Sequence, residues 1–276
     1  MHNKILDYYV RRKEISSRSG TERRRSERFC HVGALMAIEE AGLKPDIIAG
    51  VSAGSVIAVL YASGMPLDQM TKIFENKGFS DFATMSMGSG GLMNIDKFKR
   101  HILRTIGKYG AFKNLEDLKI PTYIGVTDID HGQAVEFHSG PIGERMAASC
   151  SIPIIFKPVK IDGVYHVDGG VMRNHPAWII RDKCELLIGI NVSPIRLPGK
   201  KMSITDVAMR TYNLMAKSNQ AEDMALCDLS VQTPELSSYK VFDLKNIKAV
   251  VTSGYIHTRR ALKDAGMWKT NNIKKS

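Results

Sequence analysis

Apolar and polar residues follow two different rhythms along the chain from residue 30 onward. Short, nearly continuous apolar runs predict buried strands, and stretches with apolar residues at every third or fourth position predict helices that cover them. The predicted strands are Pro45–Ala49, Thr122–Asp128, Ala134–Phe137, two short strands within Val159–Val167, Glu185–Val192 and Leu229–Gln232. The predicted helices are His31–Gly42, Gly54–Ser63, Met65–Glu75, Ile95–Ile106, Ile142–Ser149, Asn174–Lys183, Ile204–Ala225 and Asn246–Ala265, the last one broken at Gly254.

This order of elements predicts the fold class. Strands that alternate with helices are typical of an α/β domain in which a mainly parallel sheet lies between two layers of helices. Glu185–Val192 is apolar almost throughout, as in a strand that is covered on both faces. Phe79–Asn94 is rich in Gly, Ser and Met, which predicts a long loop that is either plain surface or the cover of a site. We therefore expect one three-layer α/β domain.

Candidate chemistry lies where the first predicted strand meets the next helix. Gly50-Val51-Ser52-Ala53-Gly54 places a serine between two glycines at a strand-to-helix junction, which is the nucleophile-elbow pattern. We expect side chains at Gly50 and Gly54 to collide with the neighbouring strand or helix. The Ser52 hydroxyl would project above the sheet, and the N–H of Ala53 could receive a developing oxyanion. The alternative is a Gly-rich turn with an incidental serine.

A serine nucleophile needs a base that accepts its proton. Asp168 is the best candidate, because it ends a predicted strand, precedes Gly169 and Gly170, and is expected at an exposed strand end. The alternative is an ordinary Asp-Gly turn of the kind that Asp162-Gly163 predicts nearby.

The histidines do not supply a convincing base. In the usual order of an α/β-hydrolase triad the histidine comes last. His257, the only histidine after residue 175, lies inside a predicted helix. His31 begins a helix, so we interpret it as a cap or a packed imidazole. The pattern therefore favours a Ser52/Asp168 dyad over a Ser-His-Asp triad.

Composition narrows the class of protein. The chain has 276 residues, of which 43% are hydrophobic and 24% charged, as in one globular domain. The sequence shows no apolar run of spanning length and no apolar signal core at its start, so we expect a cytoplasmic protein, at most peripheral at a membrane. Four scattered cysteines without a C-x-x-C pair predict reduced thiols. No metal and no other cofactor are expected.

The formal net charge of +11 bears on possible partners. Residues 1–29 hold nine basic and four acidic side chains and would ordinarily be predicted as a disordered arm. The arm lacks interleaved aromatic residues and a recognisable module, so no nucleic acid is expected. A basic body favours contact with anionic lipid surfaces, and the alternative is a solvated surface without a partner.

From residue 30 the motifs together resemble the bacterial patatin-like phospholipase family. The matching segments are His31 to Leu35, Ala41 to Ser55, Ser151 to Phe156, and Val167-Asp168-Gly169-Gly170 followed by Asn174 and Pro176. The resemblance implies a patatin-like domain over residues 30–276, lipid acyl hydrolysis, Ser52 as nucleophile and Asp168 as general base. It also implies that the same carboxylate first activates the serine and later activates water.

The segment before this region departs from the family pattern. The family has a first strand that ends in G-G-G-x-[RK]-G, whose glycine amides form the main oxyanion hole, but Arg23–Arg28 holds R-R-R-S-E-R. Arginines resist the φ > 0 conformations of glycine, and no buried strand of Val, Ile or Leu leads into them. We therefore treat residues 1–29 as an atypical basic segment.

The genetic code suggests a hypothesis for this departure. The codons CGG-CGG-CGG-AGC-GAA-AGG-T encode R-R-R-S-E-R. One base later the same string gives GGC-GGC-GGA-GCG-AAA-GGT, which encodes G-G-G-A-K-G. Residues 1–29 would then be an out-of-frame translation joined near Phe29 to an in-frame body. Sequencing the gene tests the hypothesis, because an intact single frame with other arginine codons contradicts it.

One function and several rivals follow from these patterns. We expect a serine lipid acyl hydrolase whose activity is weak or absent, because the loss of one oxyanion donor costs on the order of a hundred- to a thousandfold in rate. Phe79–Asn94 and Ile152–Phe156 are expected to contact acyl chains. The first rival is a catalytically degenerate patatin fold that binds lipid or a partner. An acyl-carrier transacylase is less favoured, because it would want a histidine base.

Overall fold

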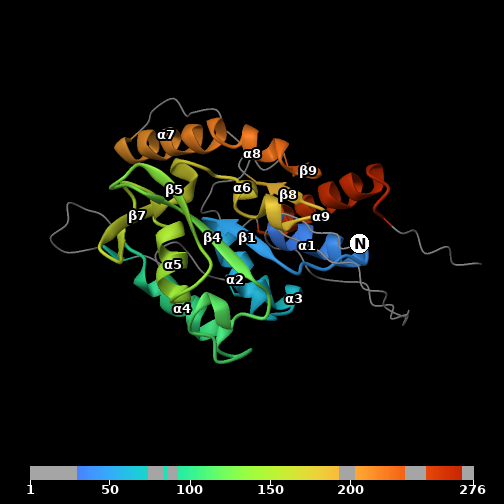
Figure 1. The fold of residues 1–276 in the computed structure, drawn as a ribbon, viewed down its shortest axis with the longest axis horizontal. Coiled ribbons are helices and arrows are strands. Elements are labelled where there is room, and N and C mark those ends of the chain that lie inside the picture. Colours follow the sequence, from blue (N-terminus) through green and yellow to red (C-terminus); the bar gives the residue numbers. More distant parts are fainter. Residues whose placement is uncertain (1–29, 74–83, 86–92, 193–202, 234–246, 269–276) are drawn as a thin grey trace, which may run out of the picture.

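The computed structural model describes residues 30–73, 84–85, 93–192, 203–233 and 247–268 (Figure 1). The helices are α1 (Cys30–Glu40), α2 (Ala53–Ala62), α3 (Leu67–Met70), α4 (Asp96–Ile106), α5 (Ile142–Ser149), α6 (Ala177–Ile180), α7 (Ile204–Ser218), α8 (Ala221–Ala225) and α9 (Ile247–Asp264), with the 3₁₀ turns η2 (Leu115–Asp117), η3 (Gly169–Val171) and η4 (Arg181–Lys183). The strands are β1 (Ile48–Val51), β2 (Thr84–Met85), β3 (Met93–Asn94), β4 (Thr122–Asp128), β5 (Gln133–Phe137), β6 (Val159–Ile161), β7 (Val164–Asp168), β8 (Ile188–Asn191) and β9 (Leu229–Gln232).

The fold class is confirmed, with helices on both faces of the main sheet. The helices α2 and α5 pack on β4, while α6 contacts β1 and α7 packs on η3. Figure 1 shows α2, α4 and α5 on one side of these strands and α6, α7 and α8 on the other. All residues of β1 are buried, as expected for a strand covered by helices on both faces, and Ile188, Gly189 and Ile190 of β8 are buried too. Within the described residues, no helix is both long and apolar enough to cross a bilayer.

The sheets are mixed, which corrects the expectation of a mainly parallel sheet. β1 pairs with β4 in parallel, and β8 pairs with β9 in parallel. The pairs β4–β5, β4–β7 and β6–β7 are antiparallel. Two tight turns explain part of this, since Gly132 and Gly163 adopt φ values of 67° and 90° and reverse the chain directly after β4 and β6. Strands joined by such short turns can only run antiparallel.

The two edges of β4 are shared in an unusual way. Ile124 and Gly125 pair with both β1 and β5, and Val126 to Asp128 pair with both β5 and β7. Since a strand has only two edges, β1 and β7 must follow one another along the same edge. They run in opposite directions and meet end to end.

The helix α9 continues through Gly254, so the predicted break there is wrong. The residue is a packing position, because a Cβ at Gly254 would overlap the carbonyl of Cys30 on α1. In the same way, a Cβ at Gly33 would overlap the carbonyl of Val251 on α9. Two glycines that face opposite helices let α1 and α9 pack with their backbones in close contact.

Some predicted elements are shorter or divided. The helix predicted over residues 204–225 ends at Ser218 and resumes at Ala221, and the helix predicted over 174–183 shrinks to α6 and η4. The helix predicted from Met65 to Glu75 is described only up to Met70 as α3. Most of Phe79–Asn94 lies outside the described residues, and its described parts pair as β2 and β3. All four cysteines are free thiols.

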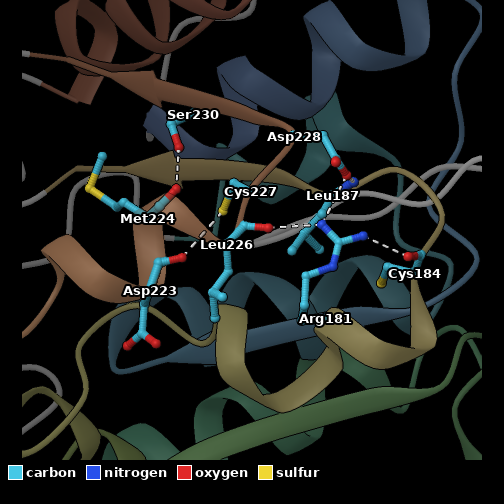
Figure 2. A network of polar contacts seen from close by, with 9 residues as sticks. All are labelled: Arg181, Cys184, Leu187, Asp223, Met224, Leu226, Cys227, Asp228 and Ser230. Atoms are coloured by element: carbon cyan, nitrogen blue, oxygen red, sulfur yellow. Dashed lines mark hydrogen bonds and ion pairs between the residues drawn. The ribbon is translucent and has the colours of Figure 1, made fainter.

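A polar network fastens the β8–β9 pair to η4 and to the end of α8 (Figure 2). The Arg181 guanidinium donates to the carbonyl of Leu226 at 2.8 Å, to the carbonyl of Cys184 at 2.6 Å and to Oδ2 of Asp228 at 3.0 Å. The same Asp228 oxygen accepts the N–H of Leu187. The side chains therefore fix the ends of β8 and β9 without a hydrogen bond to β1 among the described residues.

Candidate active site

The motif serine and the motif aspartate lie where two strands meet on one edge of β4. β1 ends where Val51 pairs with Gly125, and β7 ends where Asp168 pairs with Val126. Ser52 directly follows β1. Consecutive residues of β4 therefore bring the two candidate residues together, although they are far apart in the sequence.

Ser52 adopts the strained backbone that the elbow pattern predicts. Its φ of 53° and ψ of −125° fall in a region that residues other than glycine rarely occupy. α2 begins at the next residue, Ala53, which is exposed. Gly50 is required, because a Cβ there would overlap the backbone of Gly54. The collision predicted at Gly54 is not seen among the described residues, where the atom nearest to a Cβ there is His31 Nε2 at 4.0 Å.

Three side chains that sequence analysis did not single out hold the elbow. Ser149 at the end of α5 accepts the N–H of Ser52 at 2.9 Å and donates to the carbonyl of Gly125 at 2.8 Å. The carbonyl of Ser52 accepts from the hydroxyl of Ser55 at 2.7 Å and from the thiol of Cys150 at 3.3 Å. Because burial raises the pKa of Cys150, this thiol stays protonated and can donate.

Asp168 is fully buried, which corrects the prediction of an exposed strand end. Its Oδ1 accepts the N–H of Gly170 at 2.9 Å. The hydroxyls of Ser52 and Tyr212 also interact with the carboxylate and lower its pKa. Among the described residues, Oδ2 has no partner in full hydrogen-bond geometry. Burial outweighs the donors and raises the pKa of Asp168 to about 6. The carboxyl group is therefore mostly ionised at neutral pH, and its pKa is close to the value that suits a general base.

The two glycines after the aspartate stand where side chains would collide. A Cβ at Gly169 would lie 2.8 Å from the carbonyl oxygen of Gly125 and 3.1 Å from Cγ1 of Val51. A Cβ at Gly170 would overlap the hydroxyl of Tyr212. The first glycine therefore lets η3 pack against the end of β1, and the second leaves room for α7.

Tyr212 is a residue of this site that sequence analysis missed. It lies on the inner face of α7 at helical spacing from Met209 and Ala216, and its hydroxyl faces Ser52 and Asp168. A tyrosine on the apolar face of a helix is a detectable signal, because its buried hydroxyl usually finds a polar partner. The sequence alone does not show which group the Tyr212 hydroxyl contacts, because that depends on how α7 packs on η3.

In the described part of the chain, no histidine is among the groups that shift the pKa of Asp168. His31 and His175 are buried, and burial lowers the pKa of each to about 4. The groups that shift the pKa of Asp168 by hydrogen bonding are Ser52, Gly170 and Tyr212.

Comparison with known proteins identifies the family. A sequence model described as patatin-like phospholipase matches residues 28–180, which is more than half of the chain. The chain belongs to the patatin-like phospholipase family. The solved structure of VipD from Legionella pneumophila has the same overall fold, with a TM-score of 0.55 over 86% of this chain and 66% of VipD. At 14% identity, this likeness concerns the fold alone.

Patatin-like relatives with curated sequences are distant. An NTE family protein of Mycobacterium bovis is 26% identical over 197 residues, which cover 70% of this chain and 53% of the relative. Lysophospholipase NTE1 of Cryptococcus neoformans is 31% identical over 160 residues, which cover 55% of this chain and 10% of that protein. The chain therefore spans about half the length of the first relative and a small part of the second.

A second apolar cluster lies beside Ser52 and Asp168 in this member of the patatin-like phospholipase family. Its buried members are Ile95, Ala147, Ile152, Ile155 and Phe156. Cys150 and Tyr212, which both interact with Asp168, pack against it. An apolar wall therefore adjoins the polar centre of the site.

A large cavity lies away from this centre. It has a volume of about 1060 Å³ and is lined by residues such as Pro45, Tyr61 and Gly64, which precede β1 or end α2, whereas Ser52 lies between these two elements at their other ends. Neither Ser52 nor Asp168 lines this cavity, so we do not assign it to the candidate active site. Among the described residues, no group of three or more His, Cys, Asp or Glu side chains could hold a metal ion.

Proposed function

We propose that the chain is a serine lipid acyl hydrolase of the phospholipase A or esterase type, with Ser52 as nucleophile and Asp168 as general base. The observation that carries the proposal is the end-to-end meeting of β1 and β7 on β4, which puts a strained serine beside a buried aspartate. Family membership supports the same reaction class.

The dyad would transfer the acyl group in two halves. First, Ser52 Oγ attacks the ester carbonyl carbon while its proton moves to Asp168, and the tetrahedral intermediate collapses and expels the alcohol, which takes that proton. Next, Asp168 takes a proton from water, whose oxygen attacks the acyl carbon. The serine oxygen then leaves with the proton from Asp168. The carboxylate is regenerated in each turnover, and the scheme uses no cofactor.

The oxyanion requires N–H donors. We assign the N–H of Ala53 to this role, because the first N–H groups of a helix have no acceptor within it. Other donors would come from the segment before α1, and Arg23–Arg28 lies outside the described residues. Since that segment lacks the glycines of the family pattern, we propose an activity lowered on the order of a hundred- to a thousandfold, or lost.

The apolar cluster beside the dyad is the proposed binding region for acyl chains. It contains three residues of the segment Ile152–Phe156, and it adjoins Tyr212. The name of the fungal relative, Lysophospholipase NTE1, supports a lysophospholipid as the substrate class to test first. Contact of Phe79–Asn94 with the acyl chain remains a proposal, since most of that segment lies outside the described residues.

The outer face of α7 is the proposed contact with an anionic lipid surface. Ile204, Val207 and Leu214 are exposed on this helix, Ile204 at 86%, and their spacing places them on one face. The net charge of +11 favours anionic lipids. Free thiols fit a reducing compartment, so we propose a cytoplasmic protein that is peripheral at the membrane.

A fluorophosphonate probe tests the hydrolase, because it reports a nucleophilic serine whatever the substrate. We expect slow labelling that Ser52→Ala abolishes and Asp168→Asn slows, with exposed Ser230→Ala as the matched control. Hydrolysis of a short-chain p-nitrophenyl ester should follow the same order. Labelling of Ser52→Ala equal to wild type would contradict the proposal.

A catalytically degenerate patatin fold that binds lipid is the second candidate, favoured by R-R-R-S-E-R in place of the glycines. A chain that floats with anionic liposomes but whose Ser52 is never labelled would support it against the hydrolase.

A further inference from the structure

The helix that covers the dyad is fastened to the turn after Asp168. Asn219, which follows α7, donates through Nδ2 to the carbonyls of Gly170 and Val171 at 3.1 and 3.2 Å. Its Oδ1 accepts the N–H of Asn174 at 2.9 Å. One side chain therefore fixes the end of α7 relative to η3 through three hydrogen bonds.

An ion pair fastens the next helix to the same loop. Arg173 binds the fully buried carboxylate of Asp223 on α8, with Nε 3.1 Å from Oδ2 and Nη2 on Oδ1. The guanidinium also lies over the ring of Trp178, 5.0 Å from its centre. The position of α7 above the dyad is thus set by contacts at its own end and on α8.

Tyr212 is the residue that this position brings to the dyad. It lies on the same face of α7 as Asn219, two helical turns earlier, and its ring packs in the apolar cluster beside the site. Its hydroxyl occupies the room that Gly170 leaves open. There it lies close enough to the hydroxyl of Ser52 and the carboxylate of Asp168 to interact with both groups.

We infer that Tyr212 is a third functional residue of the site, a positioning residue whose hydroxyl holds the carboxylate of Asp168 toward Ser52. The inference rests on the proposed dyad, and it adds a residue from α7 to it. The phenol stays a donor at physiological pH, because burial and the nearby Asp168 raise the pKa of Tyr212 well above its usual value.

The consequence concerns the ionisation of the base. In the described part of the chain, the groups that face Asp168 are Ser52 at the start of α2, Cys150 after α5, Gly170 in η3 and Tyr212 on α7. The thiol of Cys150 is neutral and adds no charge. Without the hydroxyl of Tyr212, burial is opposed by fewer donors, so the pKa of Asp168 rises further.

The test is the titration of Asp168 in Tyr212→Phe, which keeps the ring and removes the hydroxyl. Chains with ¹³C-labelled aspartate carboxyls are titrated by NMR, and Asp168→Asn identifies the signal. We expect the midpoint to move up by about one pH unit, the worth of one hydrogen bond to a charged group. Labelling of Ser52 by the fluorophosphonate should then be about fivefold slower at pH 6 and unchanged at pH 9.

The matched control is Tyr255→Phe, which removes another phenol bonded to a carboxylate, that of Glu40, far from the site. It should leave the Asp168 midpoint unchanged. Should Tyr212→Phe fold poorly, 3-fluorotyrosine placed at position 212 keeps the shape and strengthens the donor, and the midpoint should move down. Equal midpoints in wild type and both Tyr212 variants would overturn the inference.

The two proposals can fail separately. If the midpoint moves but Ser52 is never labelled in any variant, the hydrolase proposal fails and the role of Tyr212 toward Asp168 stands. If Ser52 is labelled and the midpoint does not move, the inference fails and the dyad stands.

Discussion

At the residue scale, the two glycines that flank Ser52 differ in how much space surrounds them for a side chain. Gly50 lies against the backbone of Gly54, so a side chain there has no room. Gly54 lies in the first turn of α2 and has room for a methyl group as far as the described residues are concerned. Within that part of the chain, the elbow imposes a steric demand on the Gly50 side of the serine only.

A pair of alanine variants tests this asymmetry. We expect Gly50→Ala to lower the free energy of unfolding by about 1–3 kcal/mol or more, because the backbone must shift. Gly54→Ala should change it by no more than about 1 kcal/mol, and toward higher stability, because alanine favours the helix. Urea unfolding of both variants measures the difference, and equal losses would contradict the geometry.

The buried carboxylate sets the pH dependence of the site. In the proposed mechanism Asp168 must be ionised to accept the serine proton, and burial raises its pKa to about 6. We expect the rate of fluorophosphonate labelling to rise as the pH increases through about 6 and then to level off. A rate that is flat between pH 4 and pH 8 would show that another group is the base.

The raised pKa of Asp168 also makes the stability of the fold depend on pH, and stability falls over the pH range in which the labelling rate rises. A folded-state pKa raised from 3.8 to about 6 contributes stability below pH 4, and that contribution is lost as the pH rises through 6. Asp168→Asn should therefore stabilise the fold by about 3 kcal/mol at pH 8 and by little below pH 4. Thermal unfolding at both pH values measures this, and a variant less stable than wild type at pH 8 would oppose it.

Sequence analysis found the site residues that belong to a recognisable motif. It missed the residues that join the site only through tertiary contacts. Ser52 and Asp168 stand out because glycines surround them. Tyr212, Ser149 and Cys150 carry no such pattern, and their partners are fixed only when α5 and α7 pack on the sheet. The exposure of Asp168 was predicted wrongly for the same reason, since the helix that covers it is distant in sequence.

At the element scale, the contact between α1 and α9 depends on two small residues. Gly33 and Gly254 each face a backbone carbonyl of the other helix. We expect Gly254→Ala to destabilise the fold by about 1–3 kcal/mol, because the helices must move apart. Ser253→Ala in the same helix is the matched control, since it removes a hydroxyl that has no hydrogen-bond partner among the described residues. Thermal unfolding compares them, and equal melting temperatures would contradict this packing.

Local patterns predicted most elements, while their directions needed tertiary information. Helices such as α4 and α5 and both hairpins match their predicted ranges closely, because apolar spacing and turn residues are local signals. Gly254 was misinterpreted as a helix break, since a glycine for close packing and a glycine that ends a helix look alike in the sequence. The shared edge of β4 has no local signal at all.

At the scale of the whole molecule, the described strands form separate sheets. Among the described strands, β1 pairs only with β4, and β8 pairs only with β9. The family match begins at residue 28, and the division into residues 1–29 and a domain over 30–276 remains a prediction. The hypothesis that residues 1–29 are translated out of frame therefore concerns where the domain begins as well as which groups bind the oxyanion.

Restoring the other reading frame upstream of Phe29 tests that hypothesis. We expect the restored chain, with G-G-G-A-K-G in place of R-R-R-S-E-R, to label Ser52 on the order of a hundred- to a thousandfold faster, because oxyanion donors return. The control is the present chain in which only R-R-R-S-E-R is replaced by G-G-G-A-K-G. It separates the effect of these six residues from the effect of the restored sequence before them. Labelling at the rate of the present chain would contradict the hypothesis.

The packing of α1 against α9 has a consequence for biosynthesis. Val32, Leu35 and Ile38 are completely buried, and α9 is the last described helix. A ribosome makes α1 first and α9 only after nearly all the intervening residues have emerged. Throughout that interval the apolar surface of α1 that α9 covers in the folded chain has no partner, although α2 and α3 contact other parts of α1. Chaperones that bind exposed apolar surfaces should therefore associate with the growing chain until Leu262 and its neighbours are made.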